Sequence, residues 1–579
     1  MRCNEVQTQH TQHAFLVAWG RFAEQVGLIK GIQAVKLKQK RYTHTPQTKV
    51  LEFLVAILSG LRQLQEISLA AHPLDKDQAV AEAWEQPAWA DYTGISRTLS
   101  ALSWEEAHAL VQVLGQVSHP FLEAEMRLLL AQGNRLRLDG DLTGIPVSNS
   151  SKTYPGAAFG HMGNEIRLGY QAGVVSLDSP TYGRLWLSVE HHPGDTVSCT
   201  QAEALTLAAE ARLGQRPRRR TALLRQRIQA VGEQVAQVQQ RLRTQQQAVE
   251  TAQTRLAAVQ QQEQERQMTL ENLEKSYQAR QRKERPTSRL AQARRRLQAS
   301  QSRCASREKA VQATRKRLTK TQMRLAQRQA ELTRLQERLE RFEQDNADNL
   351  APIEAEFRLD AGFGTYDNVA LLIEMGYELY TKPYSHQVVR HLRGKVADQT
   401  TWTRVGANAE MVAWRAMQLK HCPYPLDVAL ERFYTGTTLK HSALLHFGAD
   451  TVIEDLPTWF KEYNGRQTIE AGIKEGKQVF YLQRIKVRSE PAIYLQECFV
   501  LFAANFIRWA AHWLDRQNPP AEETLNVRKM GIKRQVQVGA HVSAQVTRDS
   551  EGWLLRFNET SAFAGQVLKV SDNAHAPPG

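Results

Sequence analysis

Acidic side chains occur at three separated places in the sequence where they could act together on a metal-dependent reaction. Asp139 and Asp141 lie in LDGDLTG, Asp360 lies in FRLDAGFGT, and Glu470 lies in RQTIEAGIK. Two Mg²⁺ ions about 3.5 to 4 Å apart require one shared carboxylate, and further carboxylates to complete each oxygen-rich coordination shell. The three positions therefore favour two-metal phosphoryl transfer.

Glu470 belongs to a stripe of polar residues at helical spacing. The segment is predicted to be helical at least from Gln467, and residues three and four apart share one face of a helix. Such a stripe by itself is usually a solvent-facing surface. After two acidic strand ends, however, its cations are suited to hold the phosphates that flank a reaction centre. The stripe consists of Tyr463, Arg466, Glu470, Lys474 and Lys477.

The elements around these residues alternate between strand and helix patterns. Period-two spacing predicts three consecutive strands at 135–147, 166–178 and 184–195. A fourth strand is predicted at 356–364, and a helix then leads to a fifth strand at 377–382. This α/β order allows Asp139 or Asp141 on the first strand to lie beside Asp360 on the fourth.

At these residues the sequence resembles the bacterial insertion-sequence DDE transposases of the Y-R-E-K type. These transposases belong to the insertion-sequence family four-like superfamily. Their catalytic core is RNase H-like. LDGDLTG matches the first aspartate motif, FRLDAGFGT matches the second, and Y-x2-R-x3-E-x6-K is met in full. The DLT context favours Asp141 over Asp139 as the first aspartate, although both point to the same strand face. The resemblance covers most of 135–515 outside a coiled-coil insertion.

The resemblance implies a DNA transposase that cleaves and joins DNA at the ends of its element with two Mg²⁺ or Mn²⁺ ions. It implies Asp141, Asp360 and Glu470 as catalytic metal ligands, with Asp139 as the alternative first aspartate. Double-stranded DNA, as terminal inverted repeats and target, is the implied partner, bound by a homodimer in a synaptic complex. The implied phosphate-binding residues are Tyr463, Arg466, Lys474 and Lys477.

Two other functions are consistent with the same residues. One is a catalytically inactive or domesticated DNA-binding coiled-coil protein, and the other is a metal-dependent nuclease without joining activity. The chain also departs from the better-known family members, because its large insertion lies between the two aspartates rather than between the second aspartate and the glutamate. A small β insertion is predicted near 393–415.

Residues 216–345 have the heptad spacing of a coiled coil. Pro286 interrupts the pattern, so two long helices are predicted to form an antiparallel hairpin with its tip near that proline. The segment holds 31 basic and 13 acidic residues and carries the whole excess of the formal net charge of +15. Its surface is either a solvated coiled-coil face or a site of sequence-independent contact with DNA phosphates.

The remaining segments complete the predicted fold, an α/β RNase H-like core interrupted by a coiled-coil hairpin. Residues 1–130 are predicted to form an all-helical DNA-binding or dimerisation domain, in which 93–111 fit either a helix-turn-helix or two ordinary packed helices. The core is assigned to 131–215 and 346–515, and a small C-terminal β element to 516–579.

Composition excludes several other classes of protein. The five cysteines lie far apart without a C-x-x-C pair, which argues against a zinc ribbon or a disulfide framework and suits a reducing cytosol. No apolar run is long and uninterrupted enough for a membrane span. A cytosolic protein without a membrane partner is therefore expected, and the resemblance implies the bacterial cytoplasm or nucleoid.

Overall fold

The fold is known from a computed structural model that describes residues 7–39, 43–148, 154–449, 451–521, 523–550 and 552–571. The chain forms two compact units. We call Met1–Arg218 together with Asn349–Gly579 the body, and Arg219–Asp348 the arm. The mixture of helices and strands confirms the general α/β class predicted from the sequence.

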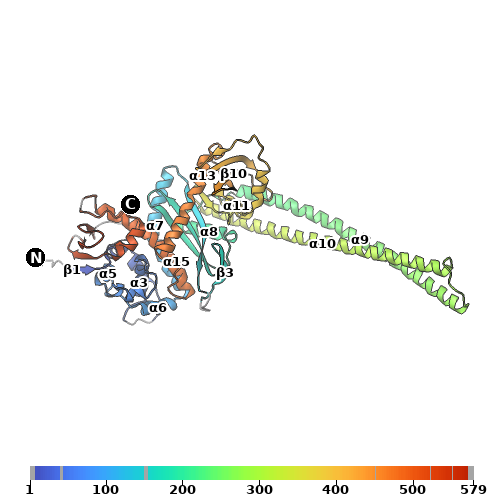
Figure 1. The fold of residues 1–579 in the computed structure, drawn as a ribbon, viewed down its shortest axis with the longest axis horizontal. Coiled ribbons are helices and arrows are strands. Elements are labelled where there is room, and N and C mark those ends of the chain that lie inside the picture. Colours follow the sequence, from blue (N-terminus) through green and yellow to red (C-terminus); the bar gives the residue numbers. More distant parts are fainter. Residues whose placement is uncertain are drawn as a thin grey trace. The chain divides into compact units, whose positions relative to one another are not determined.

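The body contains a ten-stranded mixed sheet, of which β3 and β10 are labelled in Figure 1. Its order is β3-β4-β2-β6-β7-β11-β10-β9-β8, and β5 also pairs with β4. Strand β2 is antiparallel to β4 and parallel to β6, and β6 is parallel to β7. The first five strands predicted from the sequence are therefore present, as β2, β4, β5, β6 and β7. The strands are β2 Leu136–Pro146, β3 Ala158–Met162, β4 Glu165–Ser179, β5 Gly183–Pro193, β6 Ala355–Leu359, β7 Glu378–Thr381, β8 Thr403–Arg404, β9 Ala409–Met417, β10 Leu426–Thr435 and β11 Thr438–Phe447.

The register of β2 and β4 assigns the two faces of the sheet to different helices. Leu142 pairs with Gly173, and a Cβ atom on Gly173 would lie 2.8 Å from Leu205 of helix α8 (Ala202–Leu213). Because successive side chains on a strand alternate between faces, Asp141 points to the opposite face. Helix α14 (Gln467–Gln478) contacts β2 there.

Helix α15 (Glu490–Gln517) is apolar on most of its surface and forms the core beneath the N-terminal helices. Its Trp509 stacks on Phe121 of α7 with ring centroids 4.4 Å apart, and its Phe506 lies 5.1 Å from Phe22 of α1. The N-terminal helices are α1 Ala14–Gln25, α2 Leu28–Ala34, α3 Pro46–Leu58, α4 Glu66–Leu69, α5 Gln78–Ala83, α6 Tyr92–Ser100 and α7 Trp104–Ala131. Helix α7 begins with a capping box between Ser103 and Glu106, and it packs along α15 as a core helix.

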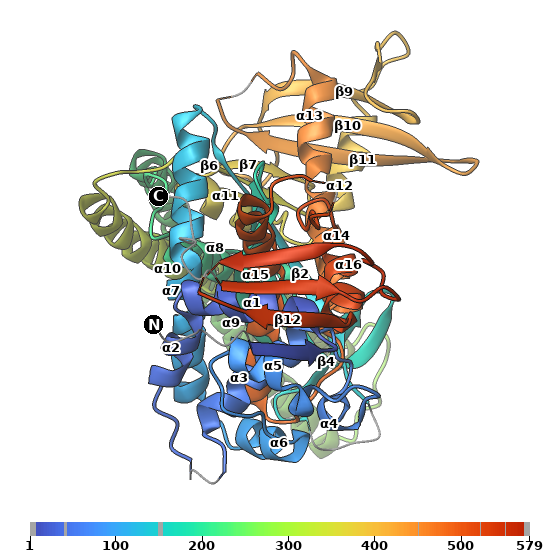
Figure 2. The same ribbon diagram turned by 90° about the vertical axis from the view of Figure 1, so that its left-hand side faces the viewer.

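The prediction of an all-helical N-terminal domain is wrong, because its first described residues form a strand. Strand β1 (Gln7–Thr11) pairs with β12 (Ala544–Arg548), and Figure 2 shows the blue β1 beside the red C-terminal strands. The resulting antiparallel sheet has the order β1-β12-β13-β14. Its other strands are β13 Gly552–Phe557 and β14 Val567–Ser571. A pairing partner more than 500 residues away leaves no local sign in the sequence.

Two smaller predictions also need correction. Part of the predicted C-terminal β element at 516–579 is instead helical, since α16 spans Ile532–Gln537 and the side-chain amide of Gln535 donates to the carbonyl of Met530. The β insertion near 393–415 is larger than predicted, since β8 to β11 run from 403 to 447 and β11 pairs with β7 of the main sheet. Val428, Ala429 and Leu430 are all buried, so β10 lacks the alternation that identifies a half-buried strand.

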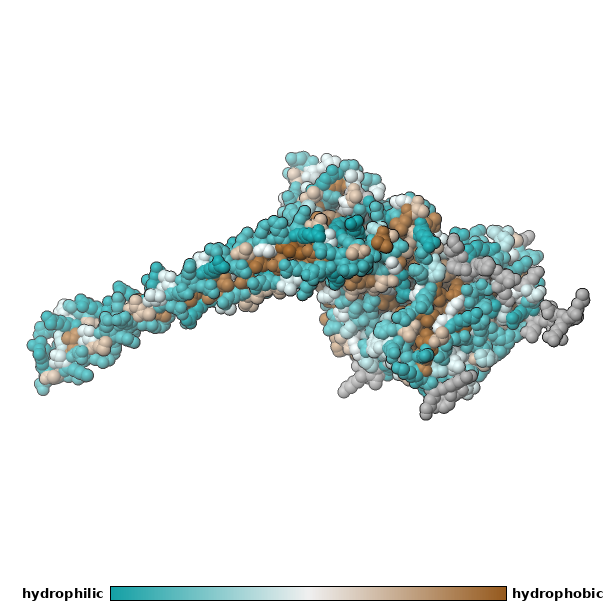
Figure 3. All heavy atoms as spheres, turned by 180° about the vertical axis from the view of Figure 1, so that it is seen from behind, coloured by the Kyte–Doolittle hydropathy of each residue, from teal (hydrophilic) through white to brown (hydrophobic). Residues whose placement is uncertain are grey.

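The arm consists of helix α9 (Thr221–Ala279) and helix α10 (Arg289–Asp348), which pack against each other along their lengths. Each helix of about 60 residues is about 90 Å long at 1.5 Å per residue. The buried seam contains predicted heptad residues such as Val231, Val238, Leu297 and Val311. On the side drawn in Figure 3, the exterior of the arm is mostly hydrophilic.

Polar side chains join the start of α9 to the end of α10 at the base of the arm. Arg219 Nε lies 2.8 Å from Asp345 Oδ2, and the side chain of Asn346 exchanges hydrogen bonds with the backbone N–H and carbonyl of Arg219. The first and last turns of the hairpin are thereby joined. No helix in the described parts of the chain is long and apolar enough to cross a bilayer.

Candidate active site

The first two acidic positions lie side by side because β2 and β6 are parallel neighbours. Gly140 pairs with Leu359, so Asp141 and Asp360 are the next residues along adjacent strands. Leu142 N–H donates to Asp141 Oδ1 at 2.8 Å, and Gly362 N–H donates to Asp360 Oδ1 at 2.9 Å. These backbone bonds fix the orientation of both carboxylates at one end of the strand pair.

Arg466 connects this strand edge to Glu470 on α14. Its Nη1 atom lies 3.7 Å from Asp141 Oδ2, and its Nη2 atom lies 2.7 Å from Glu470 Oε1. The guanidinium group is mostly buried, and Nη1 makes no hydrogen bond in the structure as described. The side chain of Glu470 is 56% exposed. Arg466 therefore bridges a mostly buried aspartate, Asp141, and an exposed glutamate, Glu470.

The electrostatics of the cluster are those of crowded carboxylates. Burial raises the pKa of Asp141 to about 6, and the negative charges of Asp360 and Glu470 add to the rise. Arg466 and the N–H of Leu142 oppose it. A carboxylate whose pKa is raised by like charges gains stability when a cation lies beside it.

The spacing of the five polar residues at 463–477 suggested a single helix face. In the structure these residues are divided between two helices. Helix α13 (Leu456–Gly465) ends before Arg466, and α14 begins at Gln467. The carbonyl of Glu462, which would accept from Arg466 N–H in a continuous helix, accepts from Arg358 Nη1 at 3.2 Å. Arg466 N–H donates to the carbonyl of Tyr463 instead. A Cβ atom on Gly465 would lie 2.6 Å from the same guanidinium nitrogen. The intruding arginine therefore explains the break in the helix.

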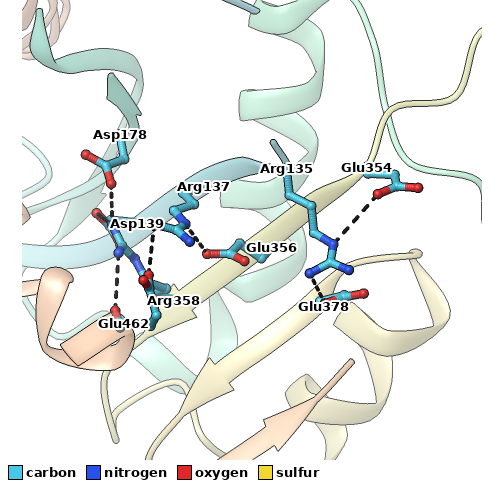
Figure 4. A network of polar contacts seen from close by, with 9 residues as sticks. All are labelled: Arg135, Arg137, Asp139, Asp178, Glu354, Glu356, Arg358, Glu378 and Glu462. Atoms are coloured by element: carbon cyan, nitrogen blue, oxygen red, sulfur yellow. Dashed lines mark hydrogen bonds and ion pairs between the residues drawn. The ribbon is translucent and has the colours of Figure 1, made fainter. Parts of the chain in front are cut away.

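Asp139 has a different environment from Asp141, although both lie on the same face of β2. Arg358 Nε and Nη2 donate to its two carboxylate oxygens at 2.7 and 2.8 Å, and both side chains are 1% exposed. Figure 4 shows this pair beside Asp178 and Glu462. Burial raises the pKa of Asp139, and Arg358 opposes the rise. Both oxygens of Asp139 are thus engaged in a buried ion pair.

Substitution of the two aspartates should separate structure from chemistry. Asp139→Asn removes the two-oxygen partner of the buried guanidinium of Arg358 and leaves only Asp178, at 3.5 Å, as a direct counter-charge. We expect a loss of about 3 kcal/mol in the free energy of unfolding. The raised pKa of Asp141 means that its ionisation lowers stability as the pH rises from about 4 to about 6. Asp141→Asn should therefore stabilise the metal-free protein at pH 7, by on the order of 3 kcal/mol.

Denaturant unfolding of both variants and the parent at pH 4 and pH 7 measures these effects. We expect the difference between Asp141→Asn and the parent to fall below about 1 kcal/mol near pH 4, where the aspartate is protonated in the folded state and about half protonated in the unfolded state. A variant at Asp139 that is as stable as the parent would show that its ion pair with Arg358 does not hold the fold together.

The basic and aromatic residues of the stripe differ in burial. Burial lowers the pKa of Lys477, and the charge of Asp141 opposes that shift, so the ammonium group lies within electrostatic reach of the cluster. Lys474 is exposed on the same helix. Tyr463 is buried, its side chain interacts with Arg466, and burial raises its pKa to about 12.

Lys382 is a member of this neighbourhood that the sequence motifs did not identify. Its Nζ atom lies 5.4 Å from the centre of the Tyr463 ring and 3.9 Å from Glu431 Oε2. It directly follows β7, which is parallel to β6, so the carboxyl ends of the two strands meet at one edge. The position of a lysine after the fifth strand was the available signal.

The chemistry of the cluster fits Mg²⁺ or Mn²⁺. Asp141, Asp360 and Glu470 supply hard carboxylate oxygens of the type these ions prefer, and the negative charges of Asp360 and Glu470 add to the effect of burial in raising the pKa of Asp141. In the structure, Arg466 supplies the counter-charge to Asp141 and Glu470. Within the described residues, no group of three or more His, Cys, Asp or Glu side chains has the arrangement of a metal site.

Comparison with known proteins gives no family assignment. No protein-family model matches the sequence, and no curated protein matches it significantly.

Proposed function

We propose that the chain is a DDE transposase of the Y-R-E-K type that cleaves and joins DNA strands at the ends of an insertion sequence. The observation that carries the proposal is the meeting of Asp141, Asp360 and Glu470 around Arg466, from three elements far apart in sequence. Phosphoryl transfer requires dense negative charge for metal binding and adjacent positive charge for phosphates, and this cluster has both.

The topology of the sheet supports an RNase H-like core. Along the sheet, the five strands lie in the order β5-β4-β2-β6-β7, and only the last two joins are parallel. The first three strands therefore form a meander, and the next two are added in parallel to its first strand. This is the arrangement expected for such a core, with the arm inserted between β5 and β6.

In the proposed mechanism, Asp141, Asp360 and Glu470 hold the metal ions. The ions would supply Lewis-acid activation of the attacking oxygen and charge neutralisation at the phosphate. Lys477 and Arg466 bind phosphate oxygens close to the cut. Tyr463 orients Arg466, and Lys382 adds positive charge over the face of the Tyr463 ring.

A cleavage and joining assay tests the proposal. The protein is incubated with labelled DNA that carries both ends of its element, with target DNA and with Mg²⁺, and the products are scored as free or joined strands. Joined products support a transposase. Cleavage without joining would indicate a nuclease, and binding without either reaction would indicate a DNA-binding protein whose chemistry is lost.

Lys477 and Lys474 form a matched pair for testing the phosphate contact. They lie three residues apart on α14, but Lys477 is partly buried near Asp141 whereas Lys474 is exposed. We expect Lys477→Ala to lower the rate of joining at least about tenfold, equivalent to roughly 1.4 kcal/mol, with little change in overall DNA affinity. Lys474→Ala should change joining much less. Equal effects on rate and affinity in Lys477→Ala would indicate a general binding role.

A further inference from the structure

A basic cavity of about 700 Å³ lies in the body, apart from the carboxylate cluster. Its walls come from the C-terminal end of β2, from the segment 483–488 that follows α14, and from the N-terminal helical region around α6. Four of its lining residues are basic, and none of the described lining residues is acidic. The basic residues are Arg62, Arg484, Lys486 and Arg488.

Lys486 is the most unusual residue of this cavity. Its Nζ atom is buried and makes no hydrogen bond in the structure as described. Burial lowers the pKa of its ammonium group to about 8, and the charge of Glu66 opposes that shift. The Oε2 atom of Glu66 accepts a hydrogen bond from the backbone N–H of Arg62 at 2.9 Å. A buried ammonium without a direct partner lowers the stability of the fold. A bound anion would neutralise that charge, so such a group is expected at an anion-binding site.

The backbone around Lys486 is held in place by α15. Lys486 N–H donates to Gln496 Oε1 at 3.0 Å, and Gln496 Nε2 donates to the carbonyls of Leu482 and Arg484 at 3.3 and 3.1 Å. Gln496 itself is buried. The ammonium group is therefore presented by a fixed loop rather than by a mobile surface segment, which reduces the entropy cost of binding an anion.

Arg488 provides a second positioned cation at the cavity. Its guanidinium carbon lies 5.1 Å from the centre of the Tyr154 ring, which also lines the cavity. Stacking on an aromatic face restricts the orientation of the arginine side chain, and a guanidinium group can donate several hydrogen bonds to phosphate oxygens. The cavity thus combines a buried point charge with a flat, multidentate donor.

The cavity is linked to the carboxylate cluster through β2. Gln483 Nε2 donates to the carbonyl of Gly144 at 3.2 Å, three residues after Asp141 on the same strand. Pro146 at the end of β2 lines the cavity, so the edge of the cavity formed by Pro146 lies about 17 Å from Asp141 along the strand at about 3.3 Å per residue. That spacing corresponds to about five nucleotides of duplex at about 3.4 Å each.

We propose that this cavity binds a backbone phosphate of the DNA strand that flanks the nucleotide held at the carboxylate cluster. Lys486 and Arg488 contact the phosphate, and the cavity fixes the register of the DNA without reading its sequence. The phosphate chemistry follows from the cavity alone, whereas the identification of the ligand as DNA rests on the proposed function.

Lys486→Met tests the proposal, because methionine keeps the buried apolar stem and removes the charge. Lys569→Met, at an exposed position on β14 of the C-terminal sheet, is the matched control. Both are made in a Glu470→Gln background so that binding is measured without cleavage. Affinity for a fluorescent 30-base-pair duplex and for pyrophosphate is measured over a range of salt concentrations, together with the thermal midpoint of unfolding.

We expect Lys486→Met to weaken duplex binding uniformly across sequences and to reduce the slope of log affinity against log salt by about 1 relative to the control. Its thermal midpoint should be unchanged or higher, because an unpaired buried charge is removed. A lower midpoint with an unchanged slope would show a structural lysine and overturn the proposal. Loss of pyrophosphate binding with an unchanged duplex slope would show a pocket for a free phosphate compound and would overturn the assignment to DNA.

The result is independent of the outcome for the carboxylates. If the duplex slope falls as expected but the parent protein neither cleaves nor joins DNA, the cavity assignment stands and the proposed transposase activity fails. If joining occurs but the slope is unchanged, the cavity assignment fails alone.

Discussion

Asp360→Asn and Glu470→Gln should each lower strand cleavage and joining in Mg²⁺ by at least about a thousandfold, with binding to element-end DNA nearly intact. Each change removes one negative charge and preserves the side-chain volume, so a metal ligand is removed while the surface that binds DNA stays the same. A thousandfold decrease corresponds to about 4 kcal/mol of transition-state stabilisation. Gel assays of cleaved and joined products, with parallel measurements of affinity, test both parts.

Glu454→Gln is a close control for Glu470→Gln. Glu454 is 66% exposed and lies 2.9 Å from Arg415, whereas Glu470 is 56% exposed and lies 2.7 Å from Arg466. Both changes therefore remove a carboxylate from an exposed arginine-paired position. We expect Glu454→Gln to keep full activity. Retained cleavage by Asp360→Asn or Glu470→Gln would rule out the assignment of the cluster as the reaction centre.

The sequence was most informative where chemistry and local periodicity coincide. Asp141 and Asp360 each lie in or just after a strand whose hydrophobic pattern is visible in the sequence, and parallel pairing of the strands brings them together. The helix predicted to run at least from Gln467 is likewise present, as α14. Motif spacing alone did not distinguish the environments of Asp139 and Asp141, because that difference depends on Arg358, an arginine 219 positions away from Asp139.

Most of the features that the sequence did not predict depend on distant partners. Arg358 interrupts the stripe helix by taking the carbonyl of Glu462, and neither residue has a local pattern that indicates this interaction. Strand β1 needs β12, and β11 needs β7. Because tertiary pairing overrides local preference in such segments, short polar or fully buried strands were missed while the heptads of the arm were found.

Removal of the arm should leave a folded body with weaker, less salt-dependent DNA binding. Arg216–Arg218 and Asn349–Ile353 must stay, because the carbonyl of Arg216 accepts from Asn349 Nδ2 at 2.8 Å and from Ile353 N–H at 3.2 Å. These bonds hold the two chain ends together, so a short glycine-serine linker can replace Arg219–Asp348. Circular dichroism and thermal unfolding check that the body folds, and an insoluble product would contradict the view of the arm as an insertion.

The charge of the arm gives the size of the expected binding effect. Arg219–Asp348 contains 29 basic and 14 acidic residues, and its removal leaves 46 of each in the rest of the chain. If the arm binds DNA, the slope of log affinity against log salt should flatten by about 0.9 for each phosphate that the shortened protein no longer neutralises. Assembly of paired ends should also fail. If the arm instead joins protomers, light scattering should show a monomer whose salt slope for single-end binding is unchanged, because the residues that neutralise phosphates all remain in the body.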